Sequence, residues 1–181
     1  MYYKIKNISK LSVLLLALVV FSTQLSAAKK VKWKLAMSWP TTLTPLASPP
    51  VQIAKMVKEM SGGKFIIQVH GKEKHKAALG ILDMVKNKQY QIGHSSSYFW
   101  KGKDINTIWF TTVPFGMTTK EQYAWFYHGD GMKYMNKVYD RFKVLSFPGG
   151  NTGSQMGGWF RKEINTVEDL KGLKMRIPGL A

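Results

Sequence analysis

The chain has 181 residues, of which 45% are hydrophobic and 20% are charged, and it contains no cysteine. These proportions are those of a folded globular protein, and the lack of thiols excludes disulfide scaffolds, thiolate metal sites and cysteine nucleophiles. Lysine and arginine number 27 against 10 acidic residues, a net charge of +17 that favours anionic partners.

The first 28 residues have the three parts of a secretory signal peptide. Three lysines precede the apolar run 11–21, and residues 26–28 are the small side chains that signal peptidase requires. The apolar run is too short to span a bilayer comfortably, although an uncleaved anchor is the alternative. We therefore expect an exported protein that has no nucleic acid partner and does not span the membrane after cleavage. Removal of residues 1–28 leaves a net charge of +14.

The first elements after the leader alternate between strand and helix. Residues 33–38 are expected to form a strand, and Ser48 is expected to cap a helix that begins at Pro49 and stops at Gly62-Gly63. The apolar residues that recur at i, i+3, i+4 and i+7 predict the buried face of this helix: Ile53, Met56, Val57 and Met60.

Further strands are expected at 64–70 and 91–95, with a helix at 79–85 between them. The order strand, helix, strand, helix, strand predicts an α/β fold with a parallel sheet.

The second half of the chain predicts more of both kinds of element. Thr118 and Glu121 have the spacing of a capping box, and the helix they open is expected to bend or break at 129–131. A second capping pair, Thr166 and Asp169, predicts a short helical turn. The remaining expectations are strands at 107–113, 142–147, 156–160 and 173–177 and a helix at 132–139.

Motifs of known enzyme chemistry are missing. The four histidines lack metal-ligand spacing, and Gly93–Ser97 lacks the final glycine of a nucleophile elbow. No pair of carboxylates stands out for acid–base catalysis. The sequence therefore gives no argument for an enzyme.

One stretch is distinctive. Gly149-Gly-Asn-Thr-Gly-Ser-Gln155-Met-Gly-Gly-Trp-Phe and, further on, Asp169-Leu-Lys-Gly-Leu-Lys-Met-Arg176-Ile-Pro-Gly179 resemble the extracytoplasmic solute-binding subunits of tripartite ATP-independent periplasmic (TRAP) transporters, the DctP family. Ser38-Trp-Pro40, His94–Gly102 and Val113–Met117 are similar to the same family's earlier signatures.

The resemblance implies a periplasmic binding protein-like (type II) fold of two α/β lobes with ligand in the cleft. Family members are roughly twice as long as this chain, as two ordinary domains require. After the signal peptide at 1–28, the resemblance therefore implies a first lobe at 29–150 and crossover strands with the start of an incomplete second lobe at 151–181. It also implies a periplasmic location.

The resemblance assigns two ligand contacts to this stretch. Arg176 matches the arginine that grips the substrate carboxylate, and its planar fork of donors suits two parallel hydrogen bonds. Gln155 matches a position whose amide oxygen binds ligand or cation, here Na⁺ or Ca²⁺ bridging the ligand carboxylate. A glutamine satisfied by backbone is the alternative for Gln155.

Three further residues are weaker candidates for ligand contact. Tyr98 and Trp100 follow the third strand, where their rings would cover the ligand's apolar carbons, with ordinary packing as the alternative. Asn151 is expected as a polar contact on the hinge side.

The resemblance implies capture of a small organic acid, a 2-oxo or 2-hydroxy carboxylate, and its delivery to the membrane permease subunits of a TRAP transporter. Two other functions stay open at this point. One is a secreted α/β enzyme without recognisable motif, and the other is a cationic protein that binds anionic surfaces.

Overall fold

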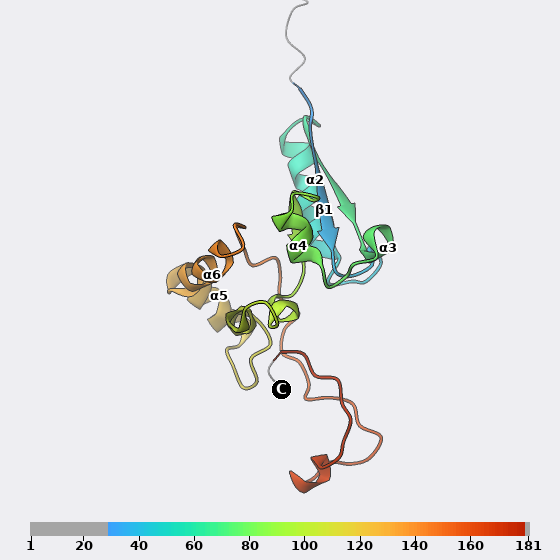
Figure 1. The fold of residues 1–181 in the computed structure, drawn as a ribbon, viewed down its shortest axis with the longest axis vertical. Coiled ribbons are helices and arrows are strands. Elements are labelled where there is room, and N and C mark those ends of the chain that lie inside the picture. Colours follow the sequence, from blue (N-terminus) through green and yellow to red (C-terminus); the bar gives the residue numbers. More distant parts are fainter. Residues whose placement is uncertain (1–28, 180–181) are drawn as a thin grey trace, which may run out of the picture. The chain divides into compact units, whose positions relative to one another are not determined.

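The fold begins with a three-stranded parallel sheet. The computed structural model describes residues 29–179, so the predicted signal peptide lies outside the described residues (Figure 1). The strands are β1 (Val31–Met37), β2 (Phe65–His70) and β3 (Ile92–His94), in the order β2-β1-β3, and both pairings are parallel. The predicted α/β class with a parallel sheet is confirmed.

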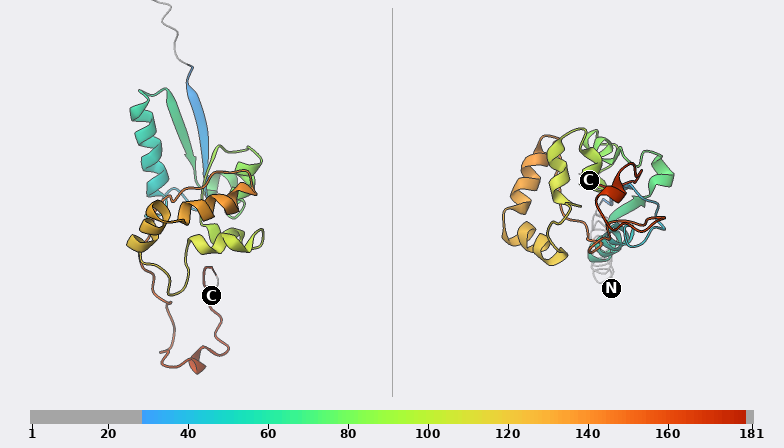
Figure 2. Two further views of the ribbon diagram at one scale, coloured as in Figure 1. Left: turned by 90° about the vertical axis from the view of Figure 1, so that its left-hand side faces the viewer. Right: turned by 90° about the horizontal axis from the view of Figure 1, so that it is seen from below.

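Helices cover the sheet on both faces because neighbouring residues of β1 point in opposite directions. Leu35 and Met37 pack with Ile67 toward α2 (Ser48–Met60), whereas Ala36 packs toward α4 (Ile81–Lys86). Figure 2 shows α2 and α4 on opposite sides of the strands. The short helix α3 (Lys72–His75) follows β2 directly.

The predicted buried face of α2 is mostly wrong. Ile53, Met56 and Met60 are 46, 54 and 76% exposed. Val57, the fourth predicted residue, does pack against the sheet, and it shares that side of the helix with the small residues Pro50 and Ala54. These also recur at i, i+4 and i+7, so the spacing alone allowed two neighbouring stripes.

The predicted start of α2 is partly right. Proline stands in the first turn, but the N-cap position is Ala47 and no side chain caps the helix. Ser48 is therefore the first helical residue rather than the cap.

A second group of helices follows β3. It comprises the 3₁₀ helices η1 (Ser97–Trp100) and η2 (Ile105–Phe110) and the α-helices α5 (Thr119–His128) and α6 (Gly131–Asp140). The predicted break at 129–131 is confirmed, since it separates α5 from α6. Their shared core holds the following buried side chains: Trp100, Phe110, Phe126, Met135 and Tyr139.

The strand predicted at 107–113 is a 3₁₀ helix over most of that range. The Asp104 carboxylate accepts a hydrogen bond from the backbone N–H of Asn106 at 2.9 Å and so caps the turn. Arg141 donates to the same carboxylate at 2.8 Å. Side chain–backbone hydrogen bonds of this kind compete with strand formation, and the β-prone composition of the segment did not reveal them.

The predicted capping box at the start of α5 is confirmed. The backbone N–H of Thr118 donates to Glu121 Oε2 at 2.7 Å, and its hydroxyl accepts from the backbone N–H of Glu121. We expect Thr118→Ala to lower the free energy of unfolding by about 1 kcal/mol, measured by urea denaturation at neutral pH.

The same box predicts a dependence on pH. Hydrogen bonds from the Thr118 backbone and hydroxyl lower the pKa of Glu121 below its usual value near 4.5. A carboxyl with a lowered folded pKa stabilises the fold above its unfolded pKa, and this contribution is lost as the pH falls through the folded value. The stability difference between wild type and Glu121→Ala should therefore shrink below about pH 4.5. A difference that stays constant down to pH 2 would contradict this account.

Gly131 permits the close approach of α6 to α5. A Cβ atom at this position would lie 2.8 Å from the Trp125 ring and 2.9 Å from the Phe126 Cα atom, which cannot move without shifting α5. We expect Gly131→Ala to destabilise by about 1–3 kcal/mol in urea denaturation, despite the better helix propensity of alanine. Gly102→Ala is the matched control, because no atom lies within 4 Å of its Cβ position. Equal stability of the two variants would contradict the packing argument.

The chain after α6 has little regular structure. The strands predicted at 142–147, 156–160 and 173–177 are not formed, and the described chain there contains one short helix, η3 (Glu168–Leu170), at the predicted Thr166–Asp169 cap. A strand requires a partner for its backbone hydrogen bonds, and no segment within 29–179 pairs with these stretches. Large apolar side chains along this part of the chain are exposed accordingly: Leu145, Phe147, Met156 and Trp159.

We call residues 152–178 the arm. Both of its ends are fixed to the rest of the fold: Asn151 is bound to α5, and Gly179 accepts a hydrogen bond from Lys101 Nζ at 3.0 Å. Gly179 has φ +81° and lies against Thr112, where only a glycine fits without strain. Of the helices in residues 29–179, none has the length and apolar character needed to cross a membrane.

Candidate functional site

The carboxyl ends of β1 and β3 meet at one edge of the sheet. The backbone N–H of Ser38, just after β1, donates to the His94 carbonyl at 3.0 Å, and the hydroxyls of Ser38 and Ser95 lie 2.6 Å apart. Open α/β sheets bind their ligands beyond the carboxyl ends of their strands. This edge is therefore the part of the sheet where the fold predicts a ligand-binding site.

His94 connects this edge to the chain before α2 and to Trp39. Its Nε2–H donates to the Leu46 carbonyl at 2.9 Å, and its ring meets Trp39 edge-on at 5.4 Å between centroids. Burial lowers the pKa of His94, which keeps the imidazole neutral near pH 7 with Nδ1 free to accept a hydrogen bond.

The chain that leaves α6 returns across the same edge. A Cβ atom on Gly149 would lie 3.1 Å from His94 Nδ1, and one on Gly150 would lie 3.2 Å from the Pro49 ring. Glycines at 149 and 150 thus allow the backbone to pass directly over β3 and the start of α2. From the sequence, His94 is assigned no individual role, although its place at the end of a predicted strand was a usable signal.

The structure gives Tyr98 and Trp100 different surroundings. Trp100 is 8% exposed and packs edge-on against Tyr139 at 5.9 Å within the core of the helices. Tyr98 is half-buried and its ring contacts Phe99 at 4.6 Å. Of the two rings, Tyr98 is the one accessible from solvent. Trp100 packs in the core, which was the alternative to ligand contact.

Asn151 holds the base of the arm on α5. Its Nδ2 donates to Gln122 Oε1 at 3.0 Å, and its Oδ1 accepts from the Thr119 hydroxyl at 3.0 Å and from the Gly153 backbone N–H at 2.7 Å. Three polar contacts within the protein occupy this side chain, so it anchors the crossing chain.

Gln155 and Arg176 both lie on the arm and are exposed. Gln155 Nε2 donates to the Thr152 hydroxyl at 3.2 Å, which leaves its amide oxygen without a partner among the described residues. Arg176 makes no hydrogen bond or ion pair with a side chain in residues 29–179. The structure does not bring these two residues into contact with Tyr98, Trp100 or Asn151.

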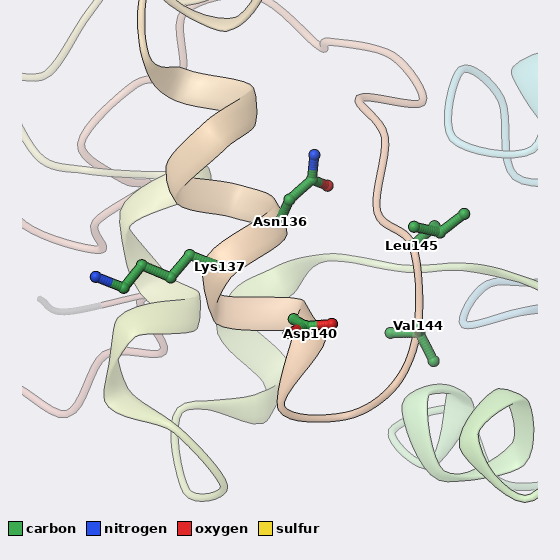
Figure 3. A pocket seen from close by; sticks show the side chains of 5 residues that line it. All are labelled: Asn136, Lys137, Asp140, Val144 and Leu145. Carbon is green, nitrogen blue, oxygen red and sulfur yellow. The ribbon is translucent and has the colours of Figure 1, made fainter.

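A hollow of about 250 Å³ lies elsewhere, between α6 and the following chain (Figure 3). Figure 3 shows Lys137 pointing away from Val144 and Leu145, and Asp140 on the side that faces Val144. The polar groups do not converge on one point, so the hollow lacks the arrangement of a ligand site. Residues 29–179 also contain no group of three or more histidine, cysteine or acidic side chains that could hold a metal ion.

The parallel sheet, its open carboxyl edge and the glycine-rich chain crossing it define the lobe of an α/β binding protein. The chain belongs to the bacterial extracellular solute-binding protein family 7 (DctP), whose family model matches residues 35–181. This confirms the resemblance found in the sequence.

Solved structures of TRAP periplasmic solute-binding proteins resemble the chain closely. One from Pseudoalteromonas atlantica T6c, with bound sodium and pyruvate, is 64% identical with a TM-score of 0.81, and one from Colwellia psychrerythraea, with bound calcium and pyruvate, is 62% identical with a TM-score of 0.81. Each match covers 83% of this chain and 46% of the other.

A curated relative agrees with this class. The monocarboxylate 2-oxoacid-binding periplasmic protein of Nostoc sp. (strain PCC 7120) is 45% identical over 150 residues, which cover 83% of this chain and 41% of the relative. The chain thus spans less than half the length of the relatives it matches.

Proposed function

We propose that this chain forms part of a periplasmic solute-binding protein that captures a small 2-oxo acid such as pyruvate for a TRAP-type transporter. The observation that carries the proposal is the 62–64% identity to two structures that hold the same acid with different cations. Residues 29–150 are the first lobe, and the chain from 151 onward begins the second. Leader cleavage after Ala28 delivers the protein to the periplasm, where the membrane permease subunits are its partners.

Arg176 is the carboxylate anchor in this proposal. Its guanidinium is exposed and has no carboxylate partner within the described residues, so it is free to bind a ligand. A planar guanidinium can donate two parallel hydrogen bonds to one carboxylate. The net charge of +14 that remains after leader cleavage adds a field that attracts small acids.

Gln155 supplies an oxygen ligand to the cation. The amide oxygen of Gln155 is unpaired among the described residues, and amide oxygens are suitable ligands for hard cations. One relative holds sodium and another holds calcium, so we expect the site of this chain to accept one of these ions. The cation neutralises the bound carboxylate together with Arg176. Further ligands are needed, because one amide cannot hold either ion.

The cation role predicts a conditional effect of Gln155→Ala. Because the chain spans less than half of its relatives, the measurement uses a chimera in which the remaining part of the Pseudoalteromonas relative follows Ala181. We expect Gln155→Ala to weaken pyruvate binding roughly 10-fold in the presence of Na⁺ or Ca²⁺, and much less in cation-free buffer. Calorimetric titration measures both conditions.

Gln68→Ala, at an exposed glutamine of β2, is the matched control for this titration. It should bind as the parent does under both conditions. A Gln155→Ala variant that loses the same factor with and without cation would rule out the metal role, and a parent chimera that binds no 2-oxo acid would overturn the proposed function.

A further inference from the structure

The face of the sheet opposite α2 is partly open and carries lysines. Lys32 and Lys34 on β1 lie beside Ile66 and Gln68 of β2 in the parallel register. Because Leu35 and Ile67 point toward α2, these residues point the other way. Lys32, Lys34 and Gln68 are exposed. The half of this face formed by β2 and the start of β1 is therefore not covered by any helix within residues 29–179, and its lysines are exposed to solvent.

Tyr90 stands at the centre of this charge. Lys34 Nζ lies 5.0 Å from the centroid of the Tyr90 ring, and the Tyr90 hydroxyl lies 3.1 Å from His70 Nδ1. Burial lowers the pKa of His70, and the positive charges of Lys34, Lys74 and His75 lower it further. The ring of His75, the neighbour of Lys74 in α3, also meets the Tyr90 ring edge-on at 5.9 Å between centroids, so β1 and α3 come together at Tyr90.

No acidic side chain neutralises this group within the described residues. The four ion pairs of residues 29–179 involve none of Lys32, Lys34 and Lys74. Glu73 is the one carboxylate in α3, and it accepts a hydrogen bond from the Thr41 hydroxyl at 3.2 Å. Two more lysines, Lys72 and Lys76, flank the same turn.

We propose that this cationic face, formed by Lys32, Lys34, Lys74 and Tyr90, binds the phosphate oxyanions of an anionic phospholipid surface. Each lysine close to such a surface strengthens binding about fivefold at low ionic strength. Three to five lysines give reversible attachment that is screened by salt. Tyrosine and lysine are also the side chains that suit the boundary between lipid and water.

An extended surface fits the observations better than a discrete acidic protein. The cations are spread over a strand and a separate turn, without the packed apolar centre of a protein–protein interface. The charge of +14 on residues 29–181 also exceeds what one small partner would neutralise.

Co-sedimentation with vesicles tests the proposal. The probes are vesicles of phosphatidylglycerol and phosphatidylcholine in equal parts, and vesicles of phosphatidylcholine alone, at low ionic strength. We expect the protein to sediment with the anionic vesicles and to stay in the supernatant with the neutral ones. The double variant Lys34→Gln/Lys74→Gln should bind about 30-fold more weakly.

The matched control removes the same charge elsewhere. Lys58→Gln/Lys120→Gln changes exposed lysines on α2 and α5. It should weaken binding less than about threefold, because salt screens charges that lie away from the bound surface. Equal losses in the two double variants would overturn the assignment to this face. So would full competition by inorganic phosphate at constant ionic strength, which would indicate a free ion as ligand, or by soluble polyglutamate, which would indicate an acidic protein. Circular dichroism verifies that each variant is folded.

Discussion

Arg176→Ala in the chimera should lose nearly all measurable affinity for pyruvate. The ligand carboxylate loses its hydration when it leaves water, and without Arg176 it receives no guanidinium hydrogen bonds in return. Arg176→Lys keeps the charge but not the planar fork, so one hydrogen bond is lost and the other is misplaced. Since a charged hydrogen bond contributes about 1.5–3 kcal/mol, the lysine variant should bind roughly 10- to 150-fold more weakly.

Arg161 provides the control for this experiment. It is an exposed arginine on the same arm, so Arg161→Ala makes the same change in charge and side-chain volume. We expect it to bind pyruvate as the parent does. If Arg176→Ala binds as tightly as Arg161→Ala, then Arg176 is not the carboxylate anchor.

Trp100→Ala should destabilise the fold by about 3–5 kcal/mol, as truncation of a buried aromatic side chain usually does. The Trp100 ring is 8% exposed and lies in the core that joins η1 to α6. Removing it leaves a cavity among large aromatic neighbours. Urea denaturation followed by circular dichroism measures the loss directly.

Tyr98→Ala separates packing from ligand contact. The Tyr98 ring is half-buried against Phe99, so its removal should lower the free energy of unfolding much less than Trp100→Ala does. In the chimera it should instead weaken pyruvate binding. A Trp100→Ala variant that keeps full stability but loses the ligand would reverse these two assignments.

The sheet could be predicted from the sequence because its signals are local. Strand-forming runs bounded by glycine or proline placed the first two strands, the short segment 91–95 placed the third, and their alternation with helices indicated parallel pairing. The capping box at Thr118 and Glu121 was equally readable, since each partner lies within three residues of the other.

Predictions failed where distant partners decide the structure. The stripe Ile53–Met60 is apolar, yet the sheet packs against the smaller stripe of Pro50, Ala54 and Val57. Which of two adjacent stripes becomes buried depends on how closely the helix approaches the sheet, and a periodic pattern does not contain that distance.

The arm illustrates a second kind of failure. Residues 156–160 and 173–177 have strand-forming composition, but composition does not supply the neighbouring strand that would pair with them. The candidate site shows the same limit. Family motifs pointed to Arg176 and Gln155, whereas the contacts of Asn151 with α5 and the position of His94 beneath Gly149 emerged only from the folded chain.

The most direct test of the proposed function is a calorimetric titration of the chimera with pyruvate and with pyruvamide, its uncharged isostere, in buffer containing Na⁺. Capture of a 2-oxo carboxylate predicts saturable binding of pyruvate and an affinity for pyruvamide that is roughly 10- to 150-fold lower, because the charged hydrogen bonds of the carboxylate are lost. Equal affinity for the two compounds, or no heat with either, would contradict the assignment of this chain to a carboxylate-binding protein.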